Sequence, residues 1–342
     1  MRRFVVVTQQ VDPEHPALAA TVPKLRALAA RVDELVVLAD SAVPGVLPAN
    51  CRVRSFRARG KVGRGIRFES ALAAELVRGR PLGVLAHMCP IYAVLAAPQA
   101  RPLRVPVLLW FTHWKASRLL RLAERVSTVA LTVEPGSFPL DSAKVRAIGH
   151  GIDLAEFPCR EPPAGPGLRA LALGRTSPAK GLPVVIEAVR RARAAGVDVS
   201  LEIRGPSLTA EERAHRAELE RLAGDGVDVA EAVPRSELPA LFARTDVLVN
   251  NMRAGAPDKV VFEACASCVP ALASNPSFAG LLDEELRFVR DDPASLAERL
   301  GRVAALPAAE RAALGCRLRA GVAASHSVDS WADGVLAAAE GR

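Results

Sequence analysis

The stretch "LALGRTSPAKGLPVVIEAV", residues 171–189, contains a short apolar run, a loop that begins and ends near glycine, and a run of helical period. Its apolar run, 170–173, predicts a buried strand, and the spacing of apolar residues over 182–194 predicts an amphipathic helix. A buried strand followed by a helix is the repeating unit of a parallel sheet covered on both faces. The stretch therefore indicates an α/β fold.

The same alternation extends in both directions. Apolar runs in the first half predict strands at 4–8, 34–38, 52–56, 83–87, 105–111, 128–133 and 145–149. In the second half, strands are predicted at 170–173, 200–204, 227–229 and 247–250, with helices at 182–194, 210–222, 235–243 and 258–266. The pattern predicts two Rossmann-like, doubly wound parallel-sheet domains.

A proline- and glycine-rich segment, "FPCREPPAGPG" at 157–167, cannot continue a helix or a central strand and predicts a connector. We expect an N-terminal domain at 1–157 and a C-terminal domain at 158–325. A last helical stretch within 326–342 can pack back on the N-terminal domain. The 342-residue length and 50% hydrophobic content suit two cores.

Length, hydropathy and cysteine usage predict a cytoplasmic protein. No apolar run approaches the length of about 20 residues that spans a bilayer, and the N-terminal apolar run is too short for a signal-peptide core. The six cysteines are scattered, which favours reduced thiols. Cys265 and Cys268 form a single CxxC, too few ligands for zinc, so we interpret both as packing residues and expect no metal site.

The positive charge is concentrated in the first half of the chain. Residues 1–150 contain 22 Lys and Arg against 10 Asp and Glu, or +12, whereas residues 151–342 contain 23 against 27, or −4. A basic half suits a phosphorylated acceptor, an acidic membrane face or nucleic acid, and a solvated surface is the alternative. Nucleic acid is disfavoured because aromatic residues make up only 4% of the chain and no known nucleic-acid module is present.

Seven cations precede the first acid in "CRVRSFRARGKVGRGIRFES", residues 51–70. Glycines in this stretch predict a loose loop, and we take Arg59, Lys61 and Arg64 as candidates for contact with an anionic or lipid-linked acceptor or with a membrane surface. A solvated loop remains the alternative reading of the same residues.

The loop after strand 170–173 has the features of a phosphate site. Ligands of parallel sheets gather outside the carboxyl ends of the strands, where a helix N-terminus carries partial positive charge. Gly174 allows a tight exit, Arg175 offers a planar fork of donors, and Lys180 adds a point charge before the helix. Two cations at that position suit a diphosphate, although both are also ordinary surface residues of a βα loop.

A second loop has a related pattern in "DVLVNNMRAGAPDKVVFEACASCVPALAS", residues 246–274. Gly255 lies in a turn of small residues, so the backbone can approach a ligand before the helix. Glu263 lies within that otherwise apolar helix. Its carboxylate can accept hydrogen bonds from the two vicinal hydroxyls of a ribose.

Four segments together resemble a known family. They are "AIGHGIDLAEF" at 147–157, "GRTSPAKGLPVVIEAV" at 174–189, "VPRSELPALFARTDVLVN" at 233–250 and "DKVVFEACASCVPALAS" at 258–274. Their order and spacing resemble the retaining glycosyltransferases of the GT-B fold, glycosyltransferase family four. The resemblance implies transfer of a sugar from a nucleoside-diphosphate sugar with retention of anomeric configuration. It also implies that the C-terminal domain binds the donor and the N-terminal domain binds the acceptor.

The resemblance assigns roles to individual residues. Arg175 and Lys180 would stabilise the departing diphosphate without a metal or other cofactor, and Glu263 would hold the ribose. His113, predicted at the end of an apolar strand, would contact the transferred sugar, and a capping or core histidine is the alternative. His150 replaces an asparagine common in the family and would line the site or form a turn.

Two positions depart from the family pattern. The first of two family glutamates, which contacts the donor sugar, falls at Gly255, so Asp258 or backbone amides near Gly255 would take over its contacts. Alternatively the sugar is held differently, as in relatives with a Pro-x-Lys turn that resembles Pro257 to Lys259. The glycine usual after the helix is Cys268. The missing glutamate leaves a second interpretation open, a noncatalytic nucleotide-sugar-binding partner of an active glycosyltransferase.

Overall fold

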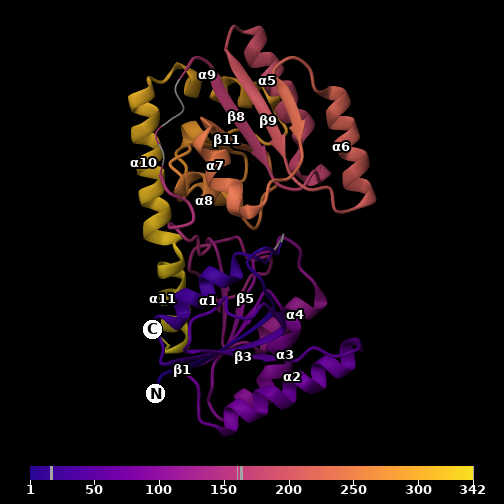
Figure 1. The fold of residues 1–342 in the computed structure, drawn as a ribbon, viewed down its shortest axis with the longest axis vertical. Coiled ribbons are helices and arrows are strands. Elements are labelled where there is room, and N and C mark those ends of the chain that lie inside the picture. Colours follow the sequence, from indigo (N-terminus) through magenta and orange to yellow (C-terminus); the bar gives the residue numbers. More distant parts are fainter. Residues whose placement is uncertain (16–17, 160, 162–164, 342) are drawn as a thin grey trace. The chain divides into compact units, whose positions relative to one another are not determined.

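The structure, a computed structural model, describes residues 1–15, 18–159, 161 and 165–341. It divides the chain into two compact units (Figure 1). Unit 1 comprises Met1–Asp153 and Ser325–Arg342, and unit 2 comprises Leu154–Ala324. Part of the predicted connector, residues 160 and 162–164, lies outside the described residues.

Unit 1 contains a seven-stranded sheet in the order β3-β2-β1-β4-β5-β6-β7, and every neighbouring pair is parallel. Its strands are β1 (Arg3–Val11), β2 (Glu34–Ala42), β3 (Cys51–Ser55), β4 (Val84–His87), β5 (Val107–Trp110), β6 (Val129–Thr132) and β7 (Val145–Ala147). Its helices are α1 (Thr21–Ala29), α2 (Gly60–Val77), α3 (Pro90–Ala100), α4 (Arg118–Val126) and α11 (Val328–Ala339). The central strands are buried along their length, as expected for a parallel sheet with both faces covered.

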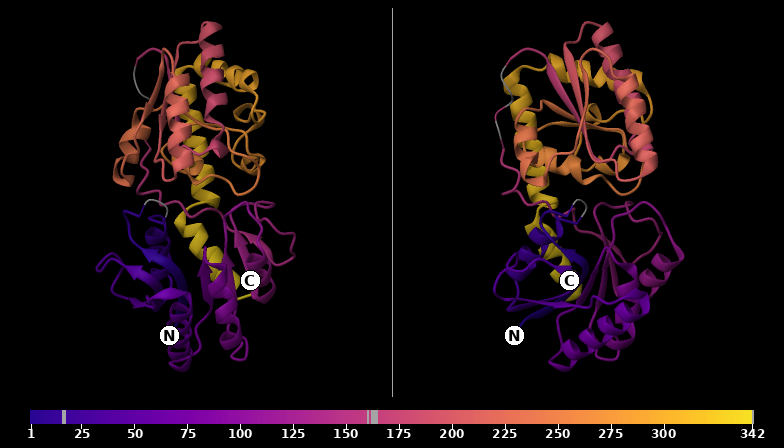
Figure 2. Two further views of the ribbon diagram at one scale, coloured as in Figure 1. Left: turned by 90° about the vertical axis from the view of Figure 1, so that its right-hand side faces the viewer. Right: turned by 45° about the vertical axis from the view of Figure 1, so that its right-hand side comes forward.

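The helices of unit 1 lie on both faces of its sheet. The direction of the right-handed crossovers reverses between β1 and β4, which places α1 on one face and α2, α3 and α4 on the other. The chain returns to unit 1 at its C-terminus, where α11 packs beside α1 (Figures 1 and 2). There Trp331 meets Trp110 edge to face at 5.6 Å, and the Lys24 ammonium lies over both rings.

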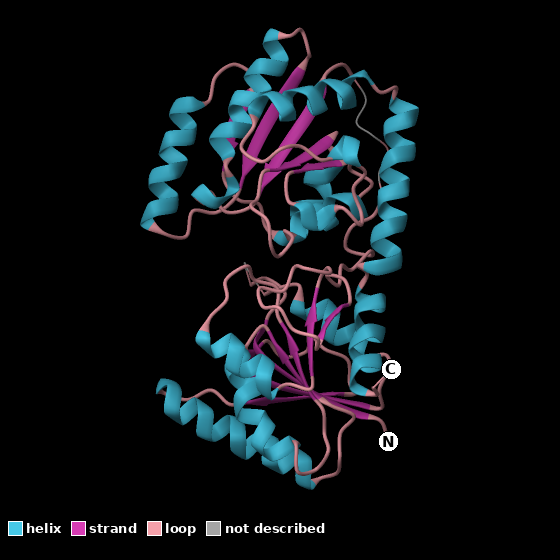
Figure 3. Cartoon of the chain, turned by 180° about the vertical axis from the view of Figure 1, so that it is seen from behind, coloured by secondary structure: helices cyan, strands magenta, loops and turns pink. Residues whose placement is uncertain are grey.

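Unit 2 contains a five-stranded parallel sheet in the order β10-β9-β8-β11-β12. Its strands are β8 (Leu168–Leu173), β9 (Val199–Arg204), β10 (Val227–Ala230), β11 (Val247–Asn250) and β12 (Ala271–Ala273). Its helices are α5 (Leu182–Ala194), α6 (Ala210–Leu222), α7 (Leu238–Ala243), α8 (Lys259–Ala266), α9 (Pro293–Ala305) and most of α10 (Ala308–Ser325). Helices cover both faces of this sheet as well (Figure 3). The predicted pair of doubly wound parallel sheets is confirmed.

Within residues 51–70, the strand predicted at 52–56 is confirmed as β3, but the loose loop predicted from the glycines is wrong, because these glycines lie in α2. The stretch forms β3 and the first part of α2, and α2 buries Phe68, Leu72 and Leu76 at the four-residue spacing of one helix face. Cations and glycines in the first turns obscured that period in the sequence. Gly60, at φ +75°, begins the helix.

The prediction that all cysteines are reduced is also wrong for one pair. Cys159 and Cys268 form a disulfide across 109 residues of unit 2, so Cys268 is not the simple packing residue we expected. Cys265, three residues earlier in α8, is free and buried. Spacing along the chain cannot reveal such a pair, because the fold brings the two cysteines together.

Candidate functional site

The candidate site lies at the carboxyl edge of the unit 2 sheet, between β8 and β11. Crossovers leave β8 and β11 in opposite directions, which makes this pair the topological switch point of the sheet. Such a switch point opens a crevice outside the strand ends, where ligands of open α/β sheets bind. The two loops that leave these strands are the loops that sequence analysis selected, 174–181 and 251–258.

Gly174 and Lys180 are packed against each other in the first loop. Gly174 has φ +129°, and a Cβ atom at this position would lie 2.6 Å from the Lys180 Nζ. The loop closes with a single 3-10 turn, Pro178–Lys180, whose Ser177 hydroxyl accepts from the Ala179 N–H. Only glycine at 174 therefore leaves room for the lysine head at the end of β8.

Lys180 joins the two loops through Asp258. Its ammonium forms a direct ion pair with Asp258 Oδ2, which also accepts a 2.9 Å hydrogen bond from Asn250 at the end of β11. Burial opposes the charged form of Asp258, but the Lys180 ammonium holds the pKa of this carboxyl below its usual value. The switch point therefore carries a fixed, charged pair at neutral pH.

Arg175 points to a different partner. Its side chain is 57% exposed, and its Nη1 lies 3.2 Å from Glu212 Oε1 at the start of α6. Arg175 and Lys180 leave the same loop, yet each meets its own carboxylate. Their predicted convergence on one diphosphate stays a prediction.

Glu263 is the most buried acid of the candidate site, at 3% exposure. Its Oε1 lies 3.1 Å from the Lys259 Nζ, one helical turn earlier, and accepts a 2.9 Å hydrogen bond from Arg235. Burial alone would raise the pKa of Glu263, but Lys259 and Arg235 hold it below its usual value. Both contacts end on Oε1, which leaves Oε2 outside this ion-pair group.

Arg235 is a site residue to which sequence reasoning gave no role. It follows β10 at the same edge of the sheet, and its Nη2 donates a 2.5 Å hydrogen bond to the Glu156 carboxylate. Its guanidinium also stacks over Phe157 at 5.3 Å. A signal was available, since Arg235 begins the helix predicted at 235–243, shortly after a predicted strand, where a cation can face the carboxyl edge of the sheet as Arg175 does.

Gly255 lies in the second loop in a conformation that excludes a glutamate. Its φ of +117° belongs to a region that only glycine occupies without strain. Its carbonyl accepts hydrogen bonds from the Ser277 hydroxyl at 2.7 Å and the Asn275 amide at 3.2 Å. The missing family glutamate is thus accompanied by a distinct backbone conformation.

The two predicted histidines, His113 and His150, lie in unit 1. His113 is exposed in the loop three residues after β5, not at the strand end as predicted, and its ring stacks on Trp114. Its Nδ1 accepts from the Lys115 N–H at 3.0 Å. His150 is buried, between Gly149 and Gly151.

The predicted contact residues of the basic stretch lie at the start of α2. Arg59 and Lys61 are exposed, and Arg64 lies 3.7 Å from Asp40. Two other arginines of the stretch serve the fold: Arg52 and Arg54 pair with the fully buried Glu75. The basic run therefore combines structural ion pairs with an exposed cationic helix start.

The comparisons with known proteins agree with this architecture. Residues 167–305 match the model of a family described as glycosyl transferases group 1. No curated protein matches the chain. This part of unit 2, which contains both loops of the candidate site, is therefore similar to the glycosyl transferases of group 1, whereas membership of family four and the retaining mode stay predictions.

Solved structures resemble the chain over nearly its whole length. Sucrose-phosphate synthase from Thermosynechococcus elongatus has a TM-score of 0.73 and 18% identity, covering 98% of this chain and 97% of its own. A glycosyltransferase from Rickettsia africae has a TM-score of 0.77 and 11% identity, covering 99% and 98%. HepE from Anabaena, solved with UDP and glucose, has a TM-score of 0.72 and 14% identity, covering 98% of both chains. The GT-B fold is confirmed.

Proposed function

We propose that this protein is a glycosyltransferase that moves a sugar from a nucleoside-diphosphate sugar to an acceptor with retention of anomeric configuration. The observation that carries the proposal is the Lys180–Asp258 pair across the switch point of unit 2. The family match over residues 167–305 and the fold shared with HepE, which was solved with UDP and glucose, support the same class of donor.

In the proposed site Lys180 meets the donor diphosphate. An ammonium has three N–H donors, so a lysine that gives one to Asp258 has others for phosphate oxygens. The N-terminus of α5 follows directly and adds partial positive charge. Negative charge on the leaving diphosphate is greatest in the transition state, where a preplaced cation accelerates bond cleavage. Arg175 would add a second cation once it leaves Glu212, so protein side chains rather than a metal ion carry this role.

Glu263 holds the ribose in this proposal. Its lowered pKa keeps the carboxylate ionised at neutral pH, and Oε2 lies outside the contacts to Lys259 and Arg235. An ionised carboxylate accepts from both hydroxyls of a vicinal diol. Lys259 and Arg235 fix its orientation.

Calorimetry with UDP, GDP, ADP and dTDP tests donor binding. We expect one of the four to bind, and Arg175→Ala combined with Lys180→Ala to abolish the signal. Arg190→Ala is the matched control, because Arg190 is an exposed cation of α5 that pairs with Glu187 in its own helix. Undiminished binding by the double variant contradicts the proposed site.

Gly255 favours a second candidate, a noncatalytic nucleotide-sugar-binding partner of an active glycosyltransferase. No side chain at this position can contact the donor sugar. Slow donor hydrolysis by the purified protein separates the two functions. If the protein hydrolyses the donor and Glu263→Ala abolishes this turnover, the protein is an enzyme; if it binds the donor tightly without turnover, it is the noncatalytic partner. A separate measurement, NMR of the anomer formed in a transfer reaction, tests retention.

For the acceptor we propose an anionic, lipid-linked molecule at a membrane surface, bound by unit 1. Its α2 and α4 begin at the carboxyl edge of the sheet and expose apolar side chains there: Val62 is 77% exposed and Ile66 61%. Trp114 and Leu122 are also exposed, and Lys61 lies among them in the sequence of α2. Among the described residues, no helix is long and apolar enough to cross a membrane.

A further inference from the structure

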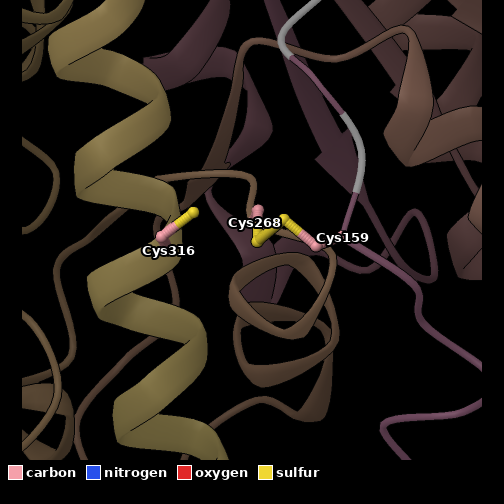
Figure 4. A group of neighbouring side chains, drawn as sticks. All are labelled: Cys159, Cys268 and Cys316. Carbon is pink, nitrogen blue, oxygen red and sulfur yellow. A yellow bond between two sulfur atoms is a disulfide. The ribbon is translucent and has the colours of Figure 1, made fainter.

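Three cysteine sulfurs of unit 2 meet in one place. Besides the disulfide between Cys159 and Cys268, the Cys316 sulfur lies in the same group, with all three Sγ atoms within 4.8 Å of one another (Figure 4). They come from three segments: the chain before β8, the second residue after α8, and α10. Cys159 and Cys316 are exposed, and Cys268 is buried.

Packing of α10 holds Cys316 beside Cys268. The preceding residue, Gly315, touches the Cys268 backbone so closely that a Cβ atom there would lie 2.0 Å from the Cys268 carbonyl oxygen. One turn later Arg319 donates to the carbonyls of Ala266, at the end of α8, and Phe157. The third sulfur is therefore placed by the core packing of unit 2.

We propose that these cysteines form a thiol–disulfide exchange site in which Cys316 replaces Cys159 as the disulfide partner of Cys268. The Cys316 thiol loses its proton to solvent, and the thiolate attacks the Cys268 Sγ. A Cys268–Cys316 bond forms while the Cys159–Cys268 bond breaks, and its electron pair leaves on the Cys159 sulfur, which takes up a proton. One disulfide and one thiol exist before and after, so the exchange needs no oxidant.

Cys265 is excluded from this exchange although it lies only three residues from Cys268. Burial raises the pKa of the Cys265 thiol to about 12, so it stays protonated near neutral pH. The attacking species in exchange is the thiolate. Cys265 therefore serves as a control cysteine, which lies near Cys268 in the sequence but should not form a disulfide with it.

Exchange would change how the segment before β8 is held. Cys159 follows Glu156 by three residues, and Glu156 binds the same Arg235 that orients Glu263. When the disulfide moves to Cys316, this segment loses its covalent attachment to α8. The link to nucleotide binding rests on the proposed function, whereas the sulfur chemistry does not.

Peptide mapping tests the exchange directly. Trypsin places the three cysteines in peptides 147–160, 260–287 and 312–317, and Cys265→Ser leaves Cys268 as the only cysteine of the second peptide. The Cys265→Ser protein is incubated in glutathione buffer near neutral pH, its free thiols are blocked with N-ethylmaleimide, and it is digested without reduction. We expect 260–287 linked to 147–160 at the start and increasingly to 312–317. Recovery of 312–317 only as a maleimide or glutathione adduct overturns the proposal.

A second variant tests the same geometry without competition. In Cys159→Ser, mild oxidation with oxidised glutathione should link Cys268 to Cys316 at least roughly tenfold faster than it links Cys268 to any other cysteine. Equal rates contradict the proposal. Circular dichroism of this variant checks its folding, and calorimetry with UDP, GDP, ADP and dTDP is a separate readout: exchange without binding of any of the four refutes the proposed function alone.

Discussion

At the scale of single residues, Glu263 has its carboxylate between two cations, in the interior of unit 2. We predict that Glu263→Gln weakens nucleoside-diphosphate binding by about 10- to 100-fold, because a neutral amide replaces a charged acceptor worth about 1.5–3 kcal/mol. Calorimetry measures this loss. Glu156→Gln is the control, since it removes a contact to the same Arg235 and leaves Glu263 intact. Equal losses in both variants would mean that Glu263 acts only by holding Arg235.

Cys268 combines a disulfide with a backbone conformation that favours glycine. Its φ is +61°, and the N–H groups of Cys268 and Val269 donate to Cys265 and Ala264, the two bonds of a Schellman motif at the end of α8. The family resemblance places glycine at this position. The disulfide thus occupies a position where a side chain costs about 1–2 kcal/mol of backbone strain.

This strain leads to a prediction under reducing conditions, where the disulfide is broken in every variant. Cys268→Gly should then be more stable to unfolding than Cys268→Ala by about 1 kcal/mol, since only alanine retains the strained Cβ. Urea unfolding in excess dithiol reductant measures the difference. Equal stability of the two variants contradicts the argument. Cys265 is the control: within α8, Cys265→Ala should be more stable to unfolding than Cys265→Gly, the opposite of the order at position 268.

At the scale of elements, Glu75 attaches α2 to the edge of the unit 1 sheet. Its fully buried carboxylate pairs with Arg3 of β1 and with Arg52 and Arg54 of β3. Burial alone would raise its pKa, but Arg52 and Arg54 lower the pKa of Glu75 to about 2. A carboxyl whose folded pKa is depressed contributes stability above its unfolded pKa and loses it as the pH falls.

We therefore predict that unit 1 loses roughly 2–3 kcal/mol of unfolding free energy from this group as the pH falls from about 4.5 to 2. Glu75→Gln should be less stable at neutral pH and should lack this part of the acid dependence. Urea unfolding at a series of pH values measures both. Glu69→Gln, a change of the same kind in α2 outside this ion-pair group, should keep the wild-type slope; an unchanged slope in Glu75→Gln contradicts the prediction.

Elements with a clear period were predictable from sequence, and others were not. The predicted bounds of α5, α6 and β11 match those of the structure: α5 has apolar residues at a helical spacing, α6 is a polar run of good helix formers, and β11 is a short continuous apolar run. Helix α10 was missed, since small residues line much of it and leave little contrast between its faces. Lys180 and Glu263 could be selected from position alone, but their contacts with Asp258 and Arg235 join segments that follow different strands, which only the sheet order brings together.

At the scale of the whole molecule, charge and exposed apolar surface are distributed unevenly. Residues 1–150 carry +12 and residues 151–342 carry −4. In unit 1, exposed Val62 and Ile66 lie in the first turns of a cationic helix start, at the carboxyl edge of the sheet. Apolar side chains with neighbouring cations are the combination that binds an anionic lipid surface. A single nonpolar side chain on a surface needs no such explanation, but this group lies at one end of α2 together with Lys61.

We predict that the protein sediments with vesicles containing anionic lipid and not with neutral phosphatidylcholine vesicles, and that binding falls as salt rises from about 0.1 to 0.5 M. Val62→Ser combined with Ile66→Ser should weaken binding by about tenfold or more, because the buried apolar area is lost while the charge remains. Lys61→Glu should weaken vesicle binding because it reverses a positive charge, and it should make binding less dependent on the salt concentration. Val77→Ser is the matched control, since Val77 is 88% exposed at the opposite end of α2. If Val77→Ser weakens binding as much as the double variant, or if neutral vesicles bind equally well, the helix start is not the lipid-binding surface.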